Sequence, residues 1–252
     1  PARNGPRYSH VAVDLLDLDD VSGKLGKLRD VTHIFYAAFQ PGTGNAANYA
    51  AVIAPNRDML VNSVSAIAKA SRSLQRVVLV TGTKYYGTHL GPLKTPMRET
   101  DPRHMPPDFY FDQIDWLTAF QRGKKWSWTE LRPQTLCGFA PGTAMSILPA
   151  IAVYAAISKE LGLPLRFPGK PGAFGTIYQA YNITNGDYFR WRNVWPRIAD
   201  VFGMKVGDVQ TISLTQQMAD KADLWVAMTK KYGLKKFDFG QLVAWPFADY
   251  VF

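Results

Sequence analysis

The stretch that decides the fold is residues 76–87, RVVLVTGTKYYG, where an apolar run ends at a glycine and a lysine. The apolar residues at 77–80 follow one another without polar alternation, which is typical of a parallel strand covered on both faces. Thr81, Gly82 and Lys84 then fall at the carboxyl end of this strand. Because ligands bind at that edge of open α/β sheets, these three residues are candidates for binding or catalysis.

Neighbouring segments predict the rest of a parallel sheet. Residues 10–17, HVAVDLLD, and 32–39, THIFYAAF, read as strands, and a further strand is expected at 129–132. Residues 56–71 carry apolar side chains at helical spacing. This helix would lead back to the strand at 76–80 by the right-handed crossover that parallel strands require.

The segment 108–117, DFYFDQIDWL, predicts a helix whose N-cap is Asp108. Trp116 and Phe120 are four residues apart and are expected to face the core, whereas Tyr110 points elsewhere. On position alone, Tyr110 would be a half-buried aromatic residue with its hydroxyl at the surface.

The C-terminal half predicts a mostly helical region. Residues 146–162 are apolar enough for a buried or pocket-lining helix, and a clear helix is expected at 189–202. Four apolar residues of the latter recur at helical spacing and read as core: Trp191, Val194, Trp195 and Ile198. We therefore expect a part built on a parallel sheet at 1–140 and a mostly helical part at 141–252.

Composition indicates an ordinary globular protein of 252 residues, with 47% hydrophobic and 19% charged residues. There is no apolar run of membrane-spanning length and no signal segment, so we expect a cytoplasmic protein with no membrane partner. A single cysteine, Cys137, excludes an intrachain disulfide.

The formal charge of +9 raises the question of nucleic-acid binding. The 29 basic residues are scattered, however, without a tract of five or more, so we expect no nucleic-acid partner. A basic surface would instead favour a phosphorylated cofactor. His89 and His104 lie in a loop without cysteine or carboxylate partners at ligand spacing, so no metal site is predicted.

Three separated motifs carry a family resemblance: TGTKYYG, DFYFDQIDWL and the later RPQTLCGFAPG. In this order they resemble the progesterone 5β-reductase and iridoid synthase-like branch of the short-chain dehydrogenase/reductases. The resemblance continues through residues 181–203. It implies a Rossmann-type parallel sheet with helices on both faces, followed by a helical substrate-binding part.

The resemblance also implies the site. Ordinary members of the superfamily carry a lysine four residues after the catalytic tyrosine, but Ile114 stands there in this chain. The branch carries its lysine after the central strand, so Lys84 and Tyr110 are the implied catalytic pair. Cofactor contacts are implied for the strand ends and for the proline turn, namely Asp14, Leu15, Ala37, Ala38, Phe39, Thr81, Gly82, Lys84, Tyr110, Pro133, Thr135 and Leu136.

Two of these assignments have plain alternatives. Asp14, with Asp17, would serve equally well to cap the helix that begins near Asp19. Packing alone would account equally well for residues 37–39.

One element of the dinucleotide-binding fold has no counterpart in the sequence. No glycine-rich turn precedes Asp14, although that turn holds the pyrophosphate in such folds. We expect the first strand-turn-helix unit to be missing, through fragmentation or natural truncation. The chain by itself should then bind NADPH weakly, and a chain extended upstream should bind it well.

The implied reaction is NADPH-dependent addition of hydride to the β-carbon of an α,β-unsaturated carbonyl compound, with NAD(H) as an alternative cofactor. The expected substrate is a small apolar enone. The alternatives are a carbonyl reductase, a sugar-nucleotide epimerase or dehydratase, and a catalytically silent nucleotide-binding or scaffold protein. A homodimer is one option for the assembly.

Overall fold

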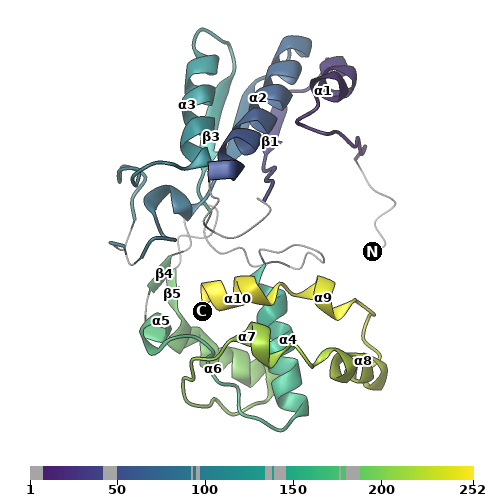
Figure 1. Cartoon of the computed structure of the whole chain (residues 1–252), viewed down its shortest axis with the longest axis vertical. Coiled ribbons are helices and arrows are strands. Elements are labelled where there is room, and N and C mark those ends of the chain that lie inside the picture. Colours follow the sequence, from purple (N-terminus) through teal and green to yellow (C-terminus); the bar gives the residue numbers. More distant parts are fainter. Residues whose placement is uncertain are drawn as a thin grey trace. The chain divides into compact units, whose positions relative to one another are not determined.

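The computed structural model describes residues 8–41, 50–91, 93–94, 97–133, 138, 146–175, 177–179 and 188–252 (Figure 1). The chain divides into two compact units, Pro1–Arg132 and Pro133–Phe252. No helix of the described residues is both long enough and apolar enough to cross a membrane.

The first unit is a parallel α/β sheet. Its strands are β1 (His33–Tyr36), β2 (Arg76–Val80) and β3 (Ser127–Leu131), in the order β1-β2-β3 and all parallel. Its helices are α1 (Leu18–Lys24), the 3-10 turn η1 (Leu25–Lys27), α2 (Ile53–Ala70), the 3-10 turn η3 (Thr83–Tyr86) and α3 (Phe109–Gln121). The predicted Rossmann-type parallel sheet is therefore confirmed.

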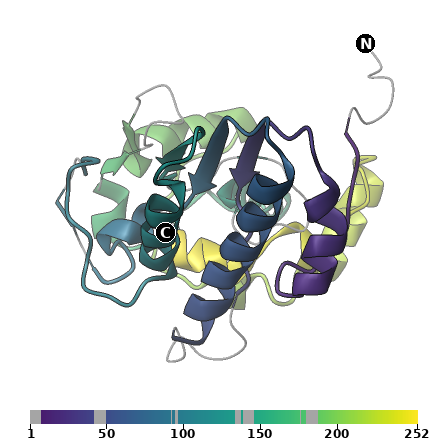
Figure 2. The same ribbon diagram turned by 90° about the horizontal axis from the view of Figure 1, so that it is seen from above.

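The central strand β2 is buried as its apolar run predicts. Val77 and Leu79 point to one face and Val78 to the other, and none of them is more than 7% exposed. Helices α2 and α3 pack against each other along the strands (Figure 2). Burial of this kind stabilises the unit by about 2 kcal/mol per large apolar side chain.

The prediction of a strand at residues 10–17 is wrong. Two backbone N–H groups of this segment bond to nearby carboxylates: Asp14 N–H donates to Asp20 Oδ2 at 2.8 Å and Leu16 N–H donates to Asp14 Oδ1 at 2.9 Å. Asp17 caps α1 by accepting from the N–H groups of the two residues that follow Leu18. Short acidic side chains therefore replace the ladder that the apolar alternation suggested.

Helix α3 begins as predicted. Asp108 Oδ1 accepts a hydrogen bond from Tyr110 N–H at 2.9 Å, which is the geometry of an N-cap. Phe111, Ile114 and Leu117 form its buried face. The two residues expected in the core, Trp116 and Phe120, are only half-buried and stack on each other with ring centroids 4.7 Å apart.

A buried asparagine ties three segments of the first unit together. Asn56, which is 0% exposed, exchanges two hydrogen bonds with the backbone of Gln40, beyond the end of β1. The Asn56 side-chain amide also donates to the Val52 carbonyl. The backbone carbonyl of Asn56 accepts a hydrogen bond from the Gln113 side chain of α3. The chain leaving β1 is thereby fixed against α2, and α2 against α3.

Asn56→Ala should lower the free energy of unfolding by about 2 kcal/mol, because the variant loses three hydrogen bonds that a completely buried amide makes. Denaturant unfolding measures this loss. Asn62→Ala is the matched control, since Asn62 lies on the same helix and makes one hydrogen bond, to the Leu15 carbonyl. An equal loss of unfolding free energy in the two variants would show that the hydrogen bonds of Asn56 stabilise the unit no more than the single bond of Asn62 does.

The second unit is mostly helical, as predicted. Its helices are α4 (Ile147–Glu160), α5 (Pro171–Gly175), α6 (Trp191–Phe202), α7 (Leu214–Gln217), α8 (Ala222–Lys231), α9 (Phe239–Leu242) and α10 (Trp245–Val251). An antiparallel pair, β4 (Ile177–Gln179) and β5 (Tyr188–Arg190), accompanies them.

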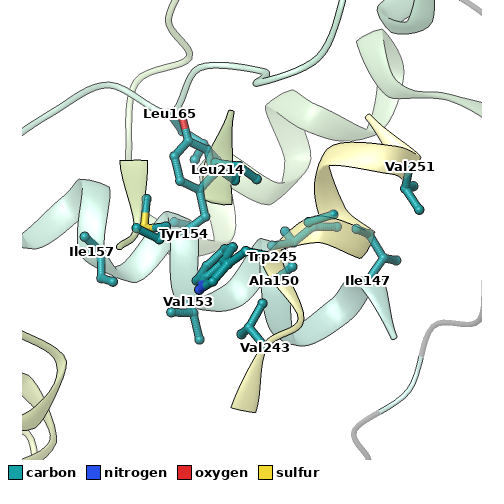
Figure 3. Packing of buried hydrophobic residues seen from close by; sticks show 14 of the residues in the cluster. Ile147, Ala150, Val153, Tyr154, Ile157, Leu165, Leu214, Val243, Trp245 and Val251 are labelled. Atoms are coloured by element: carbon teal, nitrogen blue, oxygen red, sulfur yellow. The ribbon is translucent and has the colours of Figure 1, made fainter. Parts of the chain in front are cut away.

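The core of the second unit gathers around α4. Figure 3 shows Ala150 and Val153 of α4 beside Trp245 of α10 and Val243, which precedes it. Trp195 of α6 is completely buried in the same cluster. The tryptophans at helical spacing in α6 are thus core residues, as the sequence predicts.

Candidate functional site

Most of the predicted site residues collect where the three parallel strands end. Residues 37–39 follow β1, Thr81, Gly82 and Lys84 follow β2, and Pro133 follows β3. All three strands run in the same direction, so these segments leave the sheet at one edge. Thr135 and Leu136 lie outside the described residues.

Lys84 is held on a short, fixed turn. Its 3-10 turn η3 begins after Gly82 and ends at Gly87, which has the left-handed φ of +88°. A Cβ at Gly87 would stand 3.1 Å from the Cβ of His104, so glycine serves both the turn and the close approach of that histidine. Within the described residues the half-buried Lys84 ammonium has no hydrogen bond or ion pair.

Tyr110 lies in the first turn of α3, beside the strand ends. The rings of Phe109 and Tyr110 are 4.4 Å apart, and Phe109 stacks on Phe39 at 5.6 Å. The start of α3 and the exit from β1 are therefore joined by an aromatic row. Phe39 is 44% exposed, Ala37 is exposed and Ala38 is half-buried, so this side of the edge presents small or accessible side chains.

The Lys84 side chain and the backbone N–H of Tyr110 both adjoin one group of polar side chains. Burial lowers the pKa of His89, and the positive charges of Lys84 and His104 lower it further, against the opposing charge of Asp108. Asp108 is the cap of Tyr110. The structure thus brings the turn that carries Lys84 and the helix start that carries Tyr110 to the same place in the first unit.

A polar network fixes the ends of β2 and β3. The Thr81 hydroxyl donates to Glu130 Oε1 at 2.7 Å, and Arg132 donates to Glu130 Oε2 at 2.6 Å and to the Tyr86 hydroxyl at 2.7 Å. Arg132 also lies over the Tyr85 ring, 3.5 Å from its centroid. The Thr81 side chain is therefore engaged in holding the edge together.

The charges of this network are strongly coupled. Burial acts to lower the pKa of Arg132, but the hydrogen bonds to Glu130 and Tyr86 outweigh burial and raise it above its ordinary value. Burial raises the pKa of Tyr86, and the Arg132 hydrogen bond opposes that rise. Arg132 is thus a permanent cation, and Tyr86 stays a neutral phenol.

Asp14 and Leu15 occupy a separate position in the first unit. The Asp14 side chain is exposed and closes a turn onto Leu16 N–H, while Asp17 caps α1. The Leu15 carbonyl accepts from Asn62 in α2. The structure shows that Asp17 caps the helix and that Asp14 does not, and the cofactor contact of Asp14 stays a prediction.

Sequence reasoning missed Glu130, Arg132 and Asn56, and it treated His104 as an isolated loop residue. Of these residues, only Arg132 could have been found from the sequence near it, because it is a charged residue directly after a strand at the ligand-binding edge. In the described part of the chain, no group of three or more His, Cys, Asp or Glu side chains is arranged to hold a metal ion.

The second unit contains a cleft of about 280 Å³ of its own. Its walls include Lys170, Thr211 and Asp249. Asp249 accepts hydrogen bonds from the backbone at the start of α7, which lower its pKa although burial acts in the opposite direction. None of the predicted site residues lines this cleft.

The sequence matches the family model of the PRISE-like Rossmann-fold domain over residues 12–177, which is more than half of the chain. The chain belongs to the PRISE-like family. This confirms the resemblance drawn from the three motifs.

Two relatives of this PRISE-like chain illustrate the family. An (S)-8-oxocitronellyl enol synthase, ISY1 of Nepeta cataria, is 31% identical over 96% of the chain and 70% of its own length. A 3-oxo-Delta(4,5)-steroid 5-beta-reductase of Arabidopsis thaliana is 30% identical, over 96% of the chain and 70% of its own length. Among solved structures, RMD of Pseudomonas aeruginosa, complexed with NADPH, matches 79% of the chain and 75% of its own, with a TM-score of 0.59 and 16% identity. That last likeness concerns the fold.

Proposed function

We propose that this protein is an NAD(P)H-dependent reductase that adds hydride to the β-carbon of α,β-unsaturated carbonyl compounds. The observation that carries the proposal is the Lys84 ammonium. It is half-buried at the ligand-binding edge of the sheet and has no acceptor among the described residues. Because an unpaired buried charge is costly, a ligand that supplies an acceptor would stabilise this arrangement.

The residues of this edge suit a dinucleotide. Ala37 and Ala38 leave space along the end of β1, and Lys84 offers a cationic donor after β2. One relative is named as a 5-beta-reductase of a 3-oxo-Delta(4,5) steroid, which is itself a conjugated enone, and another as an enol synthase. These names support a reaction at a conjugated carbonyl. NADP(H) is the cofactor that we propose, with NAD(H) as the alternative.

When bound, the nicotinamide supplies a hydride. As the β-carbon of the substrate receives it, the electron pair of the C=C bond moves onto the carbonyl oxygen and an enolate forms. The Tyr110 hydroxyl would donate a hydrogen bond to that oxygen, an interaction that strengthens as negative charge develops. Protonation of the α-carbon then completes the saturated ketone.

Lys84 could act in either of two ways: its ammonium can bind the hydroxyls of the nicotinamide ribose, or it can lower the pKa of the Tyr110 phenol. Lys84→Met should therefore either raise the Kd for NADPH or lower kcat, by about 10-fold. Titration of NADPH and steady-state kinetics separate the two roles. Lys94→Met is the control, because Lys94 is 65% exposed and pairs with Asp101. A variant that changed neither quantity would contradict both roles.

Product analysis tests the reaction itself. The protein that carries this sequence is incubated with NADPH and 2-cyclohexen-1-one, and the products are separated by gas chromatography. We expect cyclohexanone. The allylic alcohol would identify a plain carbonyl reductase instead, and binding of NADPH without turnover of any enone would favour the catalytically silent alternative.

A further inference from the structure

The turn that carries Lys84 is held by a residue to which the sequence assigns no role. Arg132 follows β3, and its guanidinium lies over the Tyr85 ring, with the central carbon 3.5 Å from the ring centroid. The same guanidinium donates to the Tyr86 hydroxyl at 2.7 Å. Tyr85 and Tyr86 are the two residues after Lys84 in the 3-10 turn η3. Arg132 therefore contacts the turn directly after the proposed catalytic lysine.

The chain just before Lys84 is held by the same group of side chains. Arg132 donates to Glu130 Oε2 at 2.6 Å, and the other carboxylate oxygen of Glu130 accepts from the Thr81 hydroxyl at 2.7 Å. Only two residues separate Thr81 from Lys84. The pair of Arg132 and Glu130 thus holds the chain on both sides of the lysine.

These contacts need the shape of a guanidinium as well as its charge. A guanidinium presents its N–H groups in one plane and stacks on aromatic rings, whereas an ammonium is a compact charge on a flexible stem. The Tyr85 and Tyr86 side chains are buried and that of Arg132 is largely buried, so solvent does not replace the contacts. A lysine at position 132 would keep the ion pair with Glu130 but lose the stacking on Tyr85.

The position of the Lys84 ammonium depends on the backbone of η3. In the described part of the first unit, this half-buried group makes no hydrogen bond or ion pair. The turn is closed by the bond from Tyr85 N–H to the Gly82 carbonyl at 3.1 Å and by that from Gly87 N–H to the Lys84 carbonyl at 2.8 Å. Because hydrogen bonds of 3-10 geometry are weak, such a short turn needs support from its side chains. Arg132 supplies that support through the two tyrosines.

We propose that Arg132 is a positioning residue for Lys84: it holds η3 on both sides of the lysine, so that the ammonium meets the cofactor or the Tyr110 phenol in one fixed place. This inference rests on the proposed function. It requires that loss of the guanidinium changes the reaction through Lys84 and hardly at all by any other route.

A double-variant cycle with Lys84 tests this route. Arg132→Lys keeps a positive charge beside Glu130, and thermal unfolding checks that it is folded. It should change the same quantity as Lys84→Met, either the Kd for NADPH or kcat, by about five- to tenfold. Added to Lys84→Met, it should change that quantity by less than about twofold, because the lysine that it positions is already absent. Equal factors in the two backgrounds would describe a purely structural arginine and overturn the proposal.

Arg76→Lys is the matched control for the cycle. Arg76 also joins β2 to β3, through a hydrogen bond from its guanidinium to Thr129 Oγ1 at 3.3 Å, but it is exposed and lies at the amino end of β2. Its substitution should leave both quantities within about twofold of the unchanged protein. An effect as large as that of Arg132→Lys would overturn the proposal, since any arginine between these strands would then serve.

Tyr86→Phe is a second, milder variant. It takes away the hydroxyl that accepts from Arg132 and keeps the ring. It should change the same quantity as Arg132→Lys in the same direction, by a smaller factor. A change confined to the other quantity would contradict a route through Lys84.

Hydrogen exchange tests the turn without any turnover. In Arg132→Lys, the amide hydrogens of Tyr85 and Gly87 should exchange about tenfold faster than in the unchanged protein, whereas those of residues 77–79 in β2 should not. Unchanged exchange in the turn would overturn the proposal, even in an active enzyme. Faster exchange in a protein that reduces no enone would leave Arg132 as the residue that holds the turn and would reject the proposed function.

Discussion

Tyr110→Phe should lower kcat for enone reduction by about 100-fold to 1,000-fold, the range found when a single donor to a developing oxyanion is removed. The hydroxyl is the only part of the side chain that changes. The N-cap bond uses the backbone N–H of Tyr110, and the tilted contact with Phe109 uses its ring, so both survive the substitution. The loss therefore reports the hydroxyl rather than the fold.

Tyr232→Phe is the matched control for this measurement. Tyr232 is 54% exposed and its hydroxyl bonds Glu160 on the surface of the second unit. Its kcat should stay within about twofold of the unchanged protein, because exposed substitutions of this kind cost little. Thermal unfolding of both variants confirms that they are folded. Full enone turnover by Tyr110→Phe would remove Tyr110 from the mechanism.

The effect should appear in kcat more than in KM, because the hydroxyl acts where charge develops in the transition state. The opposite pattern, a raised KM with unchanged kcat, would describe a residue that only holds the ground-state substrate. Comparing an enone with its saturated ketone as competitive inhibitor separates these two patterns.

The sequence predicted the parallel sheet because its signals are local. An unbroken apolar run is typical of a strand covered on both faces, and residues 77–79 are the buried part of the central strand. The cap of α3 was equally readable from Asp108 alone. By contrast, residues 10–17 showed apolar alternation without revealing that carboxylates would take their backbone N–H groups.

The supports of the candidate site were not readable in the same way. Arg132 meets Tyr86 across 46 positions of the sequence, and Asn56 meets Gln113 across 57. Such pairs follow from the register of the strands and the crossing of the helices, which no single segment encodes. The motifs therefore predicted which residues lie at the edge of the sheet. The residues that hold them in place are determined by tertiary packing, which the motifs do not contain.

Arg132→Met should lower the free energy of unfolding by about 3 kcal/mol, because it leaves the Glu130 carboxylate largely buried without its cation. The side chains of Glu130 and Arg132 are only 11% and 16% exposed, so solvent replaces little of the lost interaction. The Tyr86 hydroxyl and the Tyr85 ring lose their contacts in the same step. Denaturant unfolding measures the total.

Arg103→Met provides a demanding control, because Arg103 approaches the same Tyr85 ring, with 5.9 Å to its centroid. Its partner Asp115 is 65% exposed, and surface ion pairs contribute at most about 1 kcal/mol. The two arginine variants should therefore differ by about 2 kcal/mol although both remove a guanidinium from Tyr85. Equal losses would mean that stacking on Tyr85, and not the Glu130 pair, fixes the sheet edge.

A second substitution separates charge from packing. Adding Glu130→Gln to Arg132→Met removes the stranded carboxylate while keeping an acceptor for the Thr81 hydroxyl. The double variant should regain about 1–2 kcal/mol of the loss, since an unpaired buried charge costs more than an absent pair. A double variant less stable than Arg132→Met alone would show that Glu130 acts through its carboxylate hydrogen bond to Thr81, with Arg132 only as a neighbour.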